Sequence, residues 1–155
     1  MIHKSKNEPT KLFTVEEANN MLPLVRSIAG DLAALSGEVI DRRHRLNHLM
    51  DGRDRESGDV YADELAEVEK DLERNTKKLQ EFVDELRQLG VEPRGPEGLV
   101  DFPAVIEGRQ VYLCWKLGEP EVLHWHEVDE GFDGRQPLTA DTASTGDFHS
   151  GDTLE

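Results

Sequence analysis

The chain has 155 residues, of which 36 % are hydrophobic and 33 % are charged. This length allows one domain with a modest core and tails. With 18 Lys and Arg against 33 Asp and Glu, the formal net charge is −15, and such a field repels nucleic acids and anionic membranes. No apolar run approaches the roughly 20 residues of a membrane span, and the only cysteine, Cys114, excludes an internal disulfide. Because the N-terminus also lacks the apolar core of a signal peptide, we expect a cytoplasmic protein that binds neither nucleic acid nor membranes.

A capping box marks the start of the first predicted helix. The Thr14 hydroxyl can accept a hydrogen bond from the backbone of Glu17, whose carboxylate can reach back to the backbone of Thr14. Apolar residues then recur at alternating spacings of three and four as far as Met50. Pro23 interrupts this pattern and predicts a kink or a restart near Met21–Leu22. We therefore predict a helix over about residues 14–50.

The second predicted helix covers about residues 60–89 and has a more regular apolar pattern. Its heptad continues without a break, with Asn75 on the seam, where a buried amide sets the register at some cost in stability. The segment 51–59 between the two patterns is polar and contains two glycines, so it predicts a short connection. The two helices should therefore fold back as an antiparallel, coiled-coil-like hairpin.

After Pro96 the apolar residues recur with a period of two. This change predicts strands over about residues 99–106, 109–117 and 122–128. Glu107-Gly108 lies between the first two strands and has the length and composition of a two-residue hairpin turn. The sequence therefore predicts a β-meander that follows the helical hairpin.

The hairpin turn sets the register of the first two strands. It places Val100 opposite Trp115 and Phe102 opposite Leu113, so that one face of the sheet is apolar. Pro103 cannot donate a hydrogen bond to a neighbouring strand. We therefore expect the first strand to lie at an edge of the sheet.

The third strand can face either way, depending on the loop that precedes it. A connecting loop with an odd number of residues places Leu123 and Trp125 on the apolar face, whereas a loop of four residues turns His124 and His126 toward the core. Two unpaired imidazoles are poor neighbours for apolar side chains. We therefore predict the odd loop.

Together these patterns predict an α+β fold. It consists of a long antiparallel helical hairpin and a three-stranded antiparallel meander in a single domain of residues 1–138. Residues 139–155 contain four acids, no Lys or Arg and many small polar residues, which predicts a disordered acidic tail. Two amphipathic helices and a small sheet leave apolar surface uncovered, so we expect a homodimer or larger oligomer that forms through the helices.

The polar face of the predicted sheet groups residues that transition metals accept as ligands. Asp101 lies opposite Cys114, and His124 and His126 extend from the third strand on the same face. Carboxylate, thiolate and imidazole bind zinc, iron or copper, and zinc is the metal that we expect. Glu127 joins them only if the strand bulges. The plainer interpretation is a polar sheet face without a ligand.

Two of the candidate residues have alternative roles. Arg135 lies in a loop with two glycines, where it could clamp a carboxylate or phosphate of a ligand over the site or pair with a neighbouring acid. Cys114 could act as a nucleophile with a histidine base. A mid-strand position in an acidic protein instead favours an inert, partly buried thiol.

Several segments of the chain resemble one bacterial protein family. They are Leu12–Asn19, Leu22–Val25, Gly98–Ala104, Val111–Trp115, Leu117–Pro120, His124–Glu127 and Gly131–Pro137. Together they are similar to the family called domain of unknown function 2203, over roughly residues 12–138. The resemblance implies no established activity. It does indicate that the distinctive residues coincide with the predicted polar face of the sheet.

These observations support two functions from different classes. The first is a non-enzymatic scaffold or interaction module, an oligomeric helical hairpin with a metal site on its sheet. The second is a metal-dependent enzyme, hydrolase-like or oxygenase-like, that uses Asp101, Cys114, His124 and His126. The long heptad seam favours the first function, and the concentration of Cys, His and Trp in the strands favours the second. Measuring the metal content of the purified protein tests the second function, because a protein without a metal ion excludes a metal-dependent enzyme.

Overall fold

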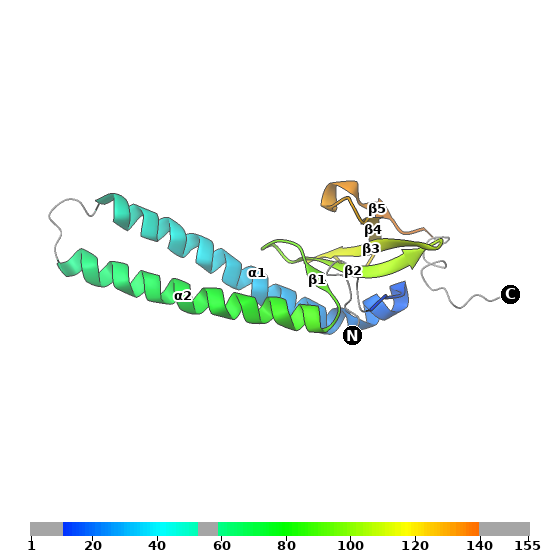
Figure 1. The fold of residues 1–155 in the computed structure, drawn as a ribbon, viewed down its shortest axis with the longest axis horizontal. Coiled ribbons are helices and arrows are strands. Elements are labelled where there is room, and N and C mark those ends of the chain that lie inside the picture. Colours follow the sequence, from blue (N-terminus) through cyan, green and yellow to red (C-terminus); the bar gives the residue numbers. More distant parts are fainter. Residues whose placement is uncertain (1–10, 53–58, 140–155) are drawn as a thin grey trace, which may run out of the picture.

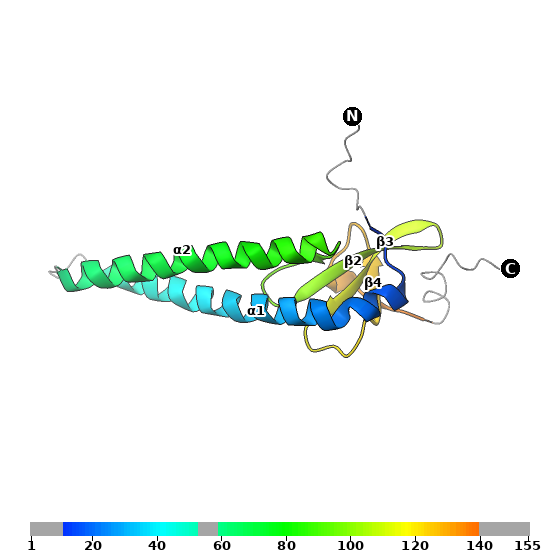
Figure 2. The ribbon, with the colours of Figure 1, turned by 90° about the horizontal axis from the view of Figure 1, so that it is seen from below.

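The computed structural model describes residues 11–52 and 59–139 (Figure 1). In this part of the chain, helices α1 (Val15–Gly52) and α2 (Asp59–Gln88) precede an antiparallel sheet. Figures 1 and 2 both show the two helices side by side, with the sheet packed against one end of the pair. The α+β class and the helical hairpin are thus confirmed, whereas supercoiling of the helices stays a prediction. The predicted tail, apart from Thr139, lies outside the described residues.

Helix α1 begins at the predicted capping box. The backbone N–H of Glu17 donates to Oγ1 of Thr14 at 3.0 Å, and the backbone N–H of Thr14 donates to Oε1 of Glu17 at 3.0 Å. The helix continues through Pro23, so the alternative of a restart at Met21–Leu22 is wrong. Figures 1 and 2 show that its first turns run at an angle to the rest, which is the bend that a proline within a helix produces.

Beyond the sheet, the two helices bury a narrow apolar seam between them. Val39 and Leu49 of α1 and Val68 of α2 are buried there. Met50, which the heptad placed on the seam, is half exposed, so that assignment is wrong. Leu49 lies on the seam instead. It follows Arg42 by seven residues, two helical turns, and Nε of Arg42 lies 3.9 Å from Oδ2 of Asp71 on α2, so both residues are on the side of α1 that faces α2.

Asn75 interrupts this seam as predicted. Its Nδ2 is buried and has no hydrogen-bond partner among the described residues. Replacing Asn75 by Leu should therefore raise the free energy of unfolding by about 1–2 kcal/mol, because it removes an unsatisfied polar group and adds apolar contact. Urea unfolding measures this change. The control is Thr76→Leu at the next, exposed position, which has a similar gain in helix propensity, and an equal gain from both variants would contradict the prediction.

The sheet consists of five strands in sequential order, not three. They are β1 (Glu92–Pro93), β2 (Leu99–Ile106), β3 (Arg109–Lys116), β4 (His124–Glu127) and β5 (Gln136–Pro137). The first and last have only two residues each, which is too short for a pattern of period two to reveal. The register of the β2–β3 hairpin is the predicted one, because Val100 pairs with Trp115 and Phe102 with Leu113.

Strand β2 is not the edge of this sheet. Strand β1 pairs with its residues Val100 and Asp101, and the backbone N–H of Phe13 donates to the carbonyl oxygen of Pro103 at 2.7 Å. The prediction that this strand lies at an edge of the sheet is therefore wrong, although Pro103 indeed donates no hydrogen bond to a neighbouring strand. Pro103 accepts a hydrogen bond there without needing an N–H of its own.

The third predicted strand is shorter than expected. Strand β4 places Trp125 opposite Leu113, and the loop 117–123 before it has an odd number of residues, as predicted. Leu123, however, precedes the strand and is exposed, so its place on the apolar face is wrong. Val122 is buried instead, and its N–H donates to Oδ1 of Asn19 at 2.7 Å, which turns the loop toward α1.

The apolar face of the sheet packs against the near ends of both helices. The face consists of Val100, Phe102, Ala104, Val111, Leu113 and Trp115, all of which are buried. Phe13 contacts Phe102 edge to face, with ring centroids 5.2 Å apart. This core reaches only as far as Leu32 on α1 and Leu79 on α2. The rest of the hairpin extends past the sheet (Figure 2).

No helix in the described part of the chain combines the length and hydrophobicity that crossing a bilayer requires.

Candidate metal centre

Three chemically reactive side chains meet on the sheet face opposite the apolar core. Asp101 of β2 pairs directly with Cys114 of β3, as predicted. His126 of β4 pairs with Tyr112 and reaches diagonally toward the other two, within the distance that side chains on neighbouring strands can span. All three residues are buried. One ligand atom from each, a carboxylate oxygen, Sγ and an imidazole nitrogen, lie within 4.8 Å of one another.

Hydrogen bonds hold the carboxylate and the imidazole of this cluster in place. Nε2 of His126 lies 3.0 Å from Oδ1 of Asp101, and Nδ1 lies 2.8 Å from the carbonyl oxygen of Glu127. On the far side, Nε of Arg94 donates to Oδ2 of Asp101 at 2.8 Å. Each ring nitrogen of His126 thus faces an oxygen atom, and the two contacts fix the orientation of the ring. The cluster therefore combines an imidazole and a carboxylate, both buried, with the guanidinium of Arg94 beside them.

The thiol of Cys114 stays protonated in this environment. Burial, together with the neighbouring Asp101 carboxylate, raises the pKa of the thiol to about 12, while the Arg135 guanidinium acts in the opposite direction. A thiol with so high a pKa is a poor nucleophile at neutral pH. The inert thiol, one of the two sequence interpretations, is the one that these surroundings favour in the absence of a metal ion.

His124 lies outside the cluster although it is the direct neighbour of Cys114 on β4. Its Nδ1 accepts a hydrogen bond from Nη2 of Arg135, and the same nitrogen of Arg135 donates to Oε2 of Glu119 at 2.6 Å. The guanidinium of Arg135 thus occupies Nδ1, one of the two ring nitrogens of His124. The structure therefore brings His124 next to Cys114, as expected, but a loop arginine binds its ring in place of the Asp101 carboxylate.

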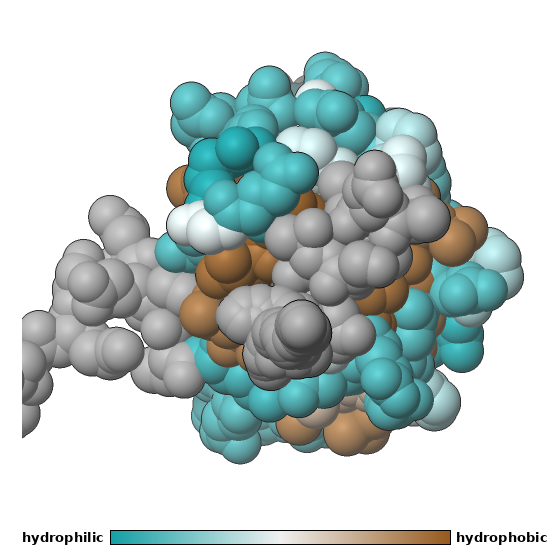
Figure 3. Space-filling model, turned by 90° about the vertical axis from the view of Figure 1, so that its right-hand side faces the viewer, coloured by the Kyte–Doolittle hydropathy of each residue, from teal (hydrophilic) through white to brown (hydrophobic). Residues whose placement is uncertain are grey.

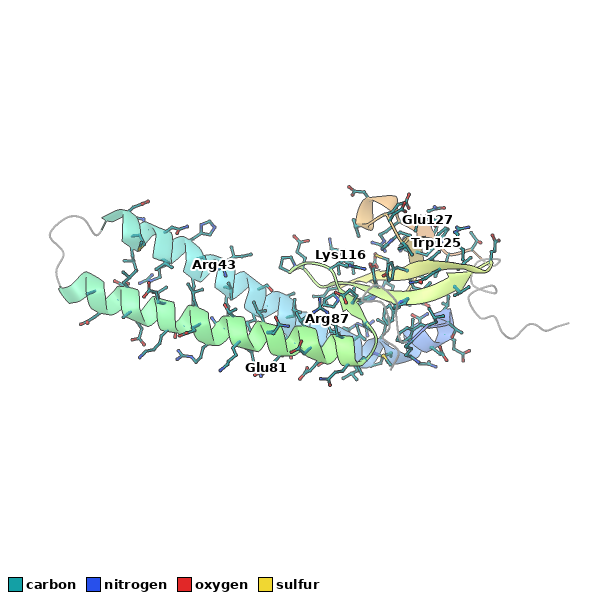
Figure 4. All side chains as sticks on the ribbon, in the orientation of Figure 1. Arg43, Glu81, Arg87, Lys116, Trp125 and Glu127 are labelled. Atoms are coloured by element: carbon teal, nitrogen blue, oxygen red, sulfur yellow. The ribbon has the colours of Figure 1, made fainter. Side chains whose placement is uncertain are left out.

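Glu127 also lies apart from the cluster. Strand β4 pairs with β3 residue by residue without a bulge, so the side chain of Glu127 faces away from its neighbour His126. Its carboxylate accepts hydrogen bonds from Nε of Arg109 at 3.1 Å and from Nη2 at 2.7 Å. Figure 4 shows Glu127 beside Trp125 on this strand. Only its backbone carbonyl, which faces His126, contributes to the site.

Sequence reasoning missed two charged residues beside the candidate centre. Arg94 follows the two-residue strand β1 and precedes the Gly95 turn, so no periodic pattern marked it. Its guanidinium also lies over the Tyr112 ring, 5.0 Å from the centroid. Glu119 lies in the turn after β3, where its Oε1 accepts from the N–H of Lys116 at 2.9 Å. Because Glu119 lies in a loop between strands, no periodic pattern in the sequence marked this role.

The fold and the cluster together define an α+β protein with a projecting helical hairpin and a buried Asp–Cys–His group. Residues 11–138 match the family described as an uncharacterized conserved protein (DUF2203), and the chain belongs to that family. The resemblance noted in the sequence is thus confirmed. No curated protein and no solved structure matches the chain.

Proposed function

We propose that this protein binds a transition metal ion, with zinc as the expected metal, through Asp101, Cys114 and His126. The observation that carries the proposal is the convergence of three different ligand types, all buried, with ligand atoms within 4.8 Å of one another. In a tetrahedral zinc site, ligand atoms are roughly 3.3–3.7 Å apart, given metal–ligand distances of about 2.0–2.3 Å. A small contraction of the three side chains brings them to that spacing.

The hydrogen bonds around the cluster suit metal binding. A histidine that binds a metal through one nitrogen commonly donates its other N–H to a backbone carbonyl, and Nδ1 of His126 already faces the carbonyl oxygen of Glu127. Oδ2 of Asp101 is held by Arg94, which leaves Oδ1 for the metal. The ion would then take the place of the hydrogen bond between Nε2 of His126 and Oδ1 of Asp101, and of the proton on the thiol of Cys114.

The burial of all three ligands supports a stabilising role for the metal rather than catalysis. Asp101, Cys114 and His126 come from three adjacent strands, β2, β3 and β4, so one ion would tie these strands together. Three protein ligands leave one coordination position open, as catalytic zinc sites do. The enzymatic alternative is a metal-dependent hydrolase-like or oxygenase-like reaction. It requires a substrate to reach ligands that are now at most 2 % exposed.

The projecting hairpin supports a second function, as an interaction module. Both helices extend past the sheet, and Leu24, Ile40 and Met50 remain exposed on α1. Figure 3 shows that hydrophobic residues also reach the surface at the sheet end. We propose self-association through the helices, as the sequence led us to expect. Light scattering that gives only the 17.5 kDa mass of one chain at micromolar concentration contradicts this proposal.

Replacing His126 by Ala should lower the affinity for zinc by about 100-fold or more, because one of three ligands is lost. The matched control is His124→Ala, two residues away on the same strand, which should leave the affinity nearly unchanged since that ring binds Arg135. Competition with a chromophoric chelator measures both affinities, and circular dichroism checks that each variant folds. Equal losses in the two variants, or no zinc binding by the native chain, would refute the site.

A cobalt(II) titration gives an independent test of the thiol ligand. Cobalt bound to Cys114 should produce a sulfur-to-metal charge-transfer band that Cys114→Ser abolishes. Since the thiol has a pKa of about 12, metal binding must displace its proton. The apparent affinity should therefore rise at least about tenfold for each pH unit near neutrality.

A further inference from the structure

Arg135 has a buried donor without an acceptor. Its side chain is only 9 % exposed, and its Nη2 donates to Glu119 and His124. Its Nε, which is also buried, has no hydrogen-bond partner among the described residues. An unsatisfied buried donor costs about 1–3 kcal/mol, and more when it is charged. The described part of the chain therefore supplies no acceptor for this buried donor.

Arg135 and a second cation, Lys116, lie beside one aromatic ring, that of Phe132. The Cζ of Arg135 is 4.6 Å from the centroid of the Phe132 ring, and Nζ of Lys116 is 5.3 Å from it. No carboxylate of the described residues lies within salt-bridge distance of Lys116, which Figure 4 shows at the end of its strand. Among the described residues, Glu119 is the carboxylate that pairs with Arg135. The two cations therefore share one bonded carboxylate.

We propose that Arg135 and Lys116 bind a small oxyanion, a phosphate or carboxylate group, beside Phe132. An oxyanion oxygen satisfies the Nε donor and supplies Lys116 with an anionic partner, whereas a water molecule does only the first. The neighbouring turn, Phe132–Gly134, contains no buried residue, so a movement of this turn breaks no contact of the apolar core. The site uses none of the three proposed metal ligands and stands independently of metal binding.

The Nε–H resonance of Arg135 in a ¹H–¹⁵N spectrum reports this interaction directly. The metal-free protein is titrated with inorganic phosphate, with acetate, and with chloride at matched ionic strength. The peak of Arg135 is assigned as the one that is missing from the spectrum of Arg135→Lys. We expect phosphate or acetate to shift the peak saturably and chloride to leave it in place. Whichever oxyanion saturates the shift identifies the ligand group as phosphate or carboxylate. A peak that neither oxyanion moves, or that chloride moves equally, overturns the proposal in favour of a bound water only.

Lys116→Gln tests the second cation without disturbing the buried arginine. It should weaken oxyanion binding by about tenfold, the loss of one charge-assisted contact. The matched control is Lys78→Gln, since Lys78 also lies 5.3 Å from the centroid of a phenylalanine ring, that of Phe82 on α2. This control should bind the oxyanion as the native chain does. Equal binding by Lys116→Gln and the native chain removes Lys116 from the site and overturns the two-cation proposal.

Discussion

Replacing Asp101 by Asn is expected to lower the free energy of unfolding by about 1.5–3 kcal/mol, the usual contribution of hydrogen bonds to a charged group. The carboxylate is almost fully buried between Nε2 of His126 and Nε of Arg94. An asparagine offers one carbonyl oxygen to these two groups and turns its own N–H₂ group toward the other. The variant therefore loses one of the two hydrogen bonds that hold the buried side chain. Urea unfolding of the metal-free protein measures the loss.

The chain contains a matched control for this substitution. Glu127 is also a sheet carboxylate bonded to an arginine, Arg109, but both side chains are partly exposed. Because exposed ion pairs contribute about 0–1 kcal/mol, Glu127→Gln should change the stability little. Similar losses in Asp101→Asn and Glu127→Gln would show that the buried group around Asp101 has no special energetic role.

Raising the pH should destabilise the metal-free protein through Cys114. The pKa of its thiol rises from the ordinary value of 9.0 to about 12 on folding, so the unfolded chain releases this proton before the folded chain does. The contribution to stability is therefore complete below about pH 9 and is lost as the pH rises toward the folded pKa. Linkage gives a slope of about 1.4 kcal/mol per pH unit in that window.

Cys114→Ala isolates this effect from other groups that titrate at alkaline pH. Between about pH 9 and about pH 10.5, the native chain should lose about 2 kcal/mol more stability than the variant. Urea unfolding with a chelator and a reducing agent present measures both curves. The alanine leaves a small cavity, but the cost of that cavity does not depend on pH. Parallel curves for the two proteins would mean that the thiol titrates alike in the folded and unfolded states.

The sequence predicted the backbone well at tight turns and helix ends, where the local geometry accepts only a few residue types. Glu107 and Gly108 both have positive φ angles, 54° and 77°, which is the requirement of a tight two-residue hairpin turn. That turn alone sets the pairing of Asp101 with Cys114. The Thr14–Glu17 capping box set the start of α1 in the same way. Each of these features acts within a few residues, so a single sequence reveals it.

The side-chain partners of the histidines could not be predicted by the same means. Strand register made His124 the neighbour of Cys114, and the structure has that pairing. The ring of His124 nevertheless binds Arg135, a residue of the following loop, whereas His126 reaches Asp101 two strands away. Register specifies which backbones are adjacent. It does not specify which of several polar groups, contributed by loops without periodicity, competes successfully for each ring.

The length of the hairpin has a mechanical consequence. Helix α1 has 38 residues, but the core that anchors it to the sheet ends at Leu32. The stretch from Leu32 to Gly52 therefore forms an arm about 30 Å long at 1.5 Å per residue. A rotation of about 10° where the helices meet the sheet moves the far end of this arm by about 5 Å. Small adjustments of packing at the sheet are thus magnified into displacements as large as a helical turn at the opposite end of the molecule.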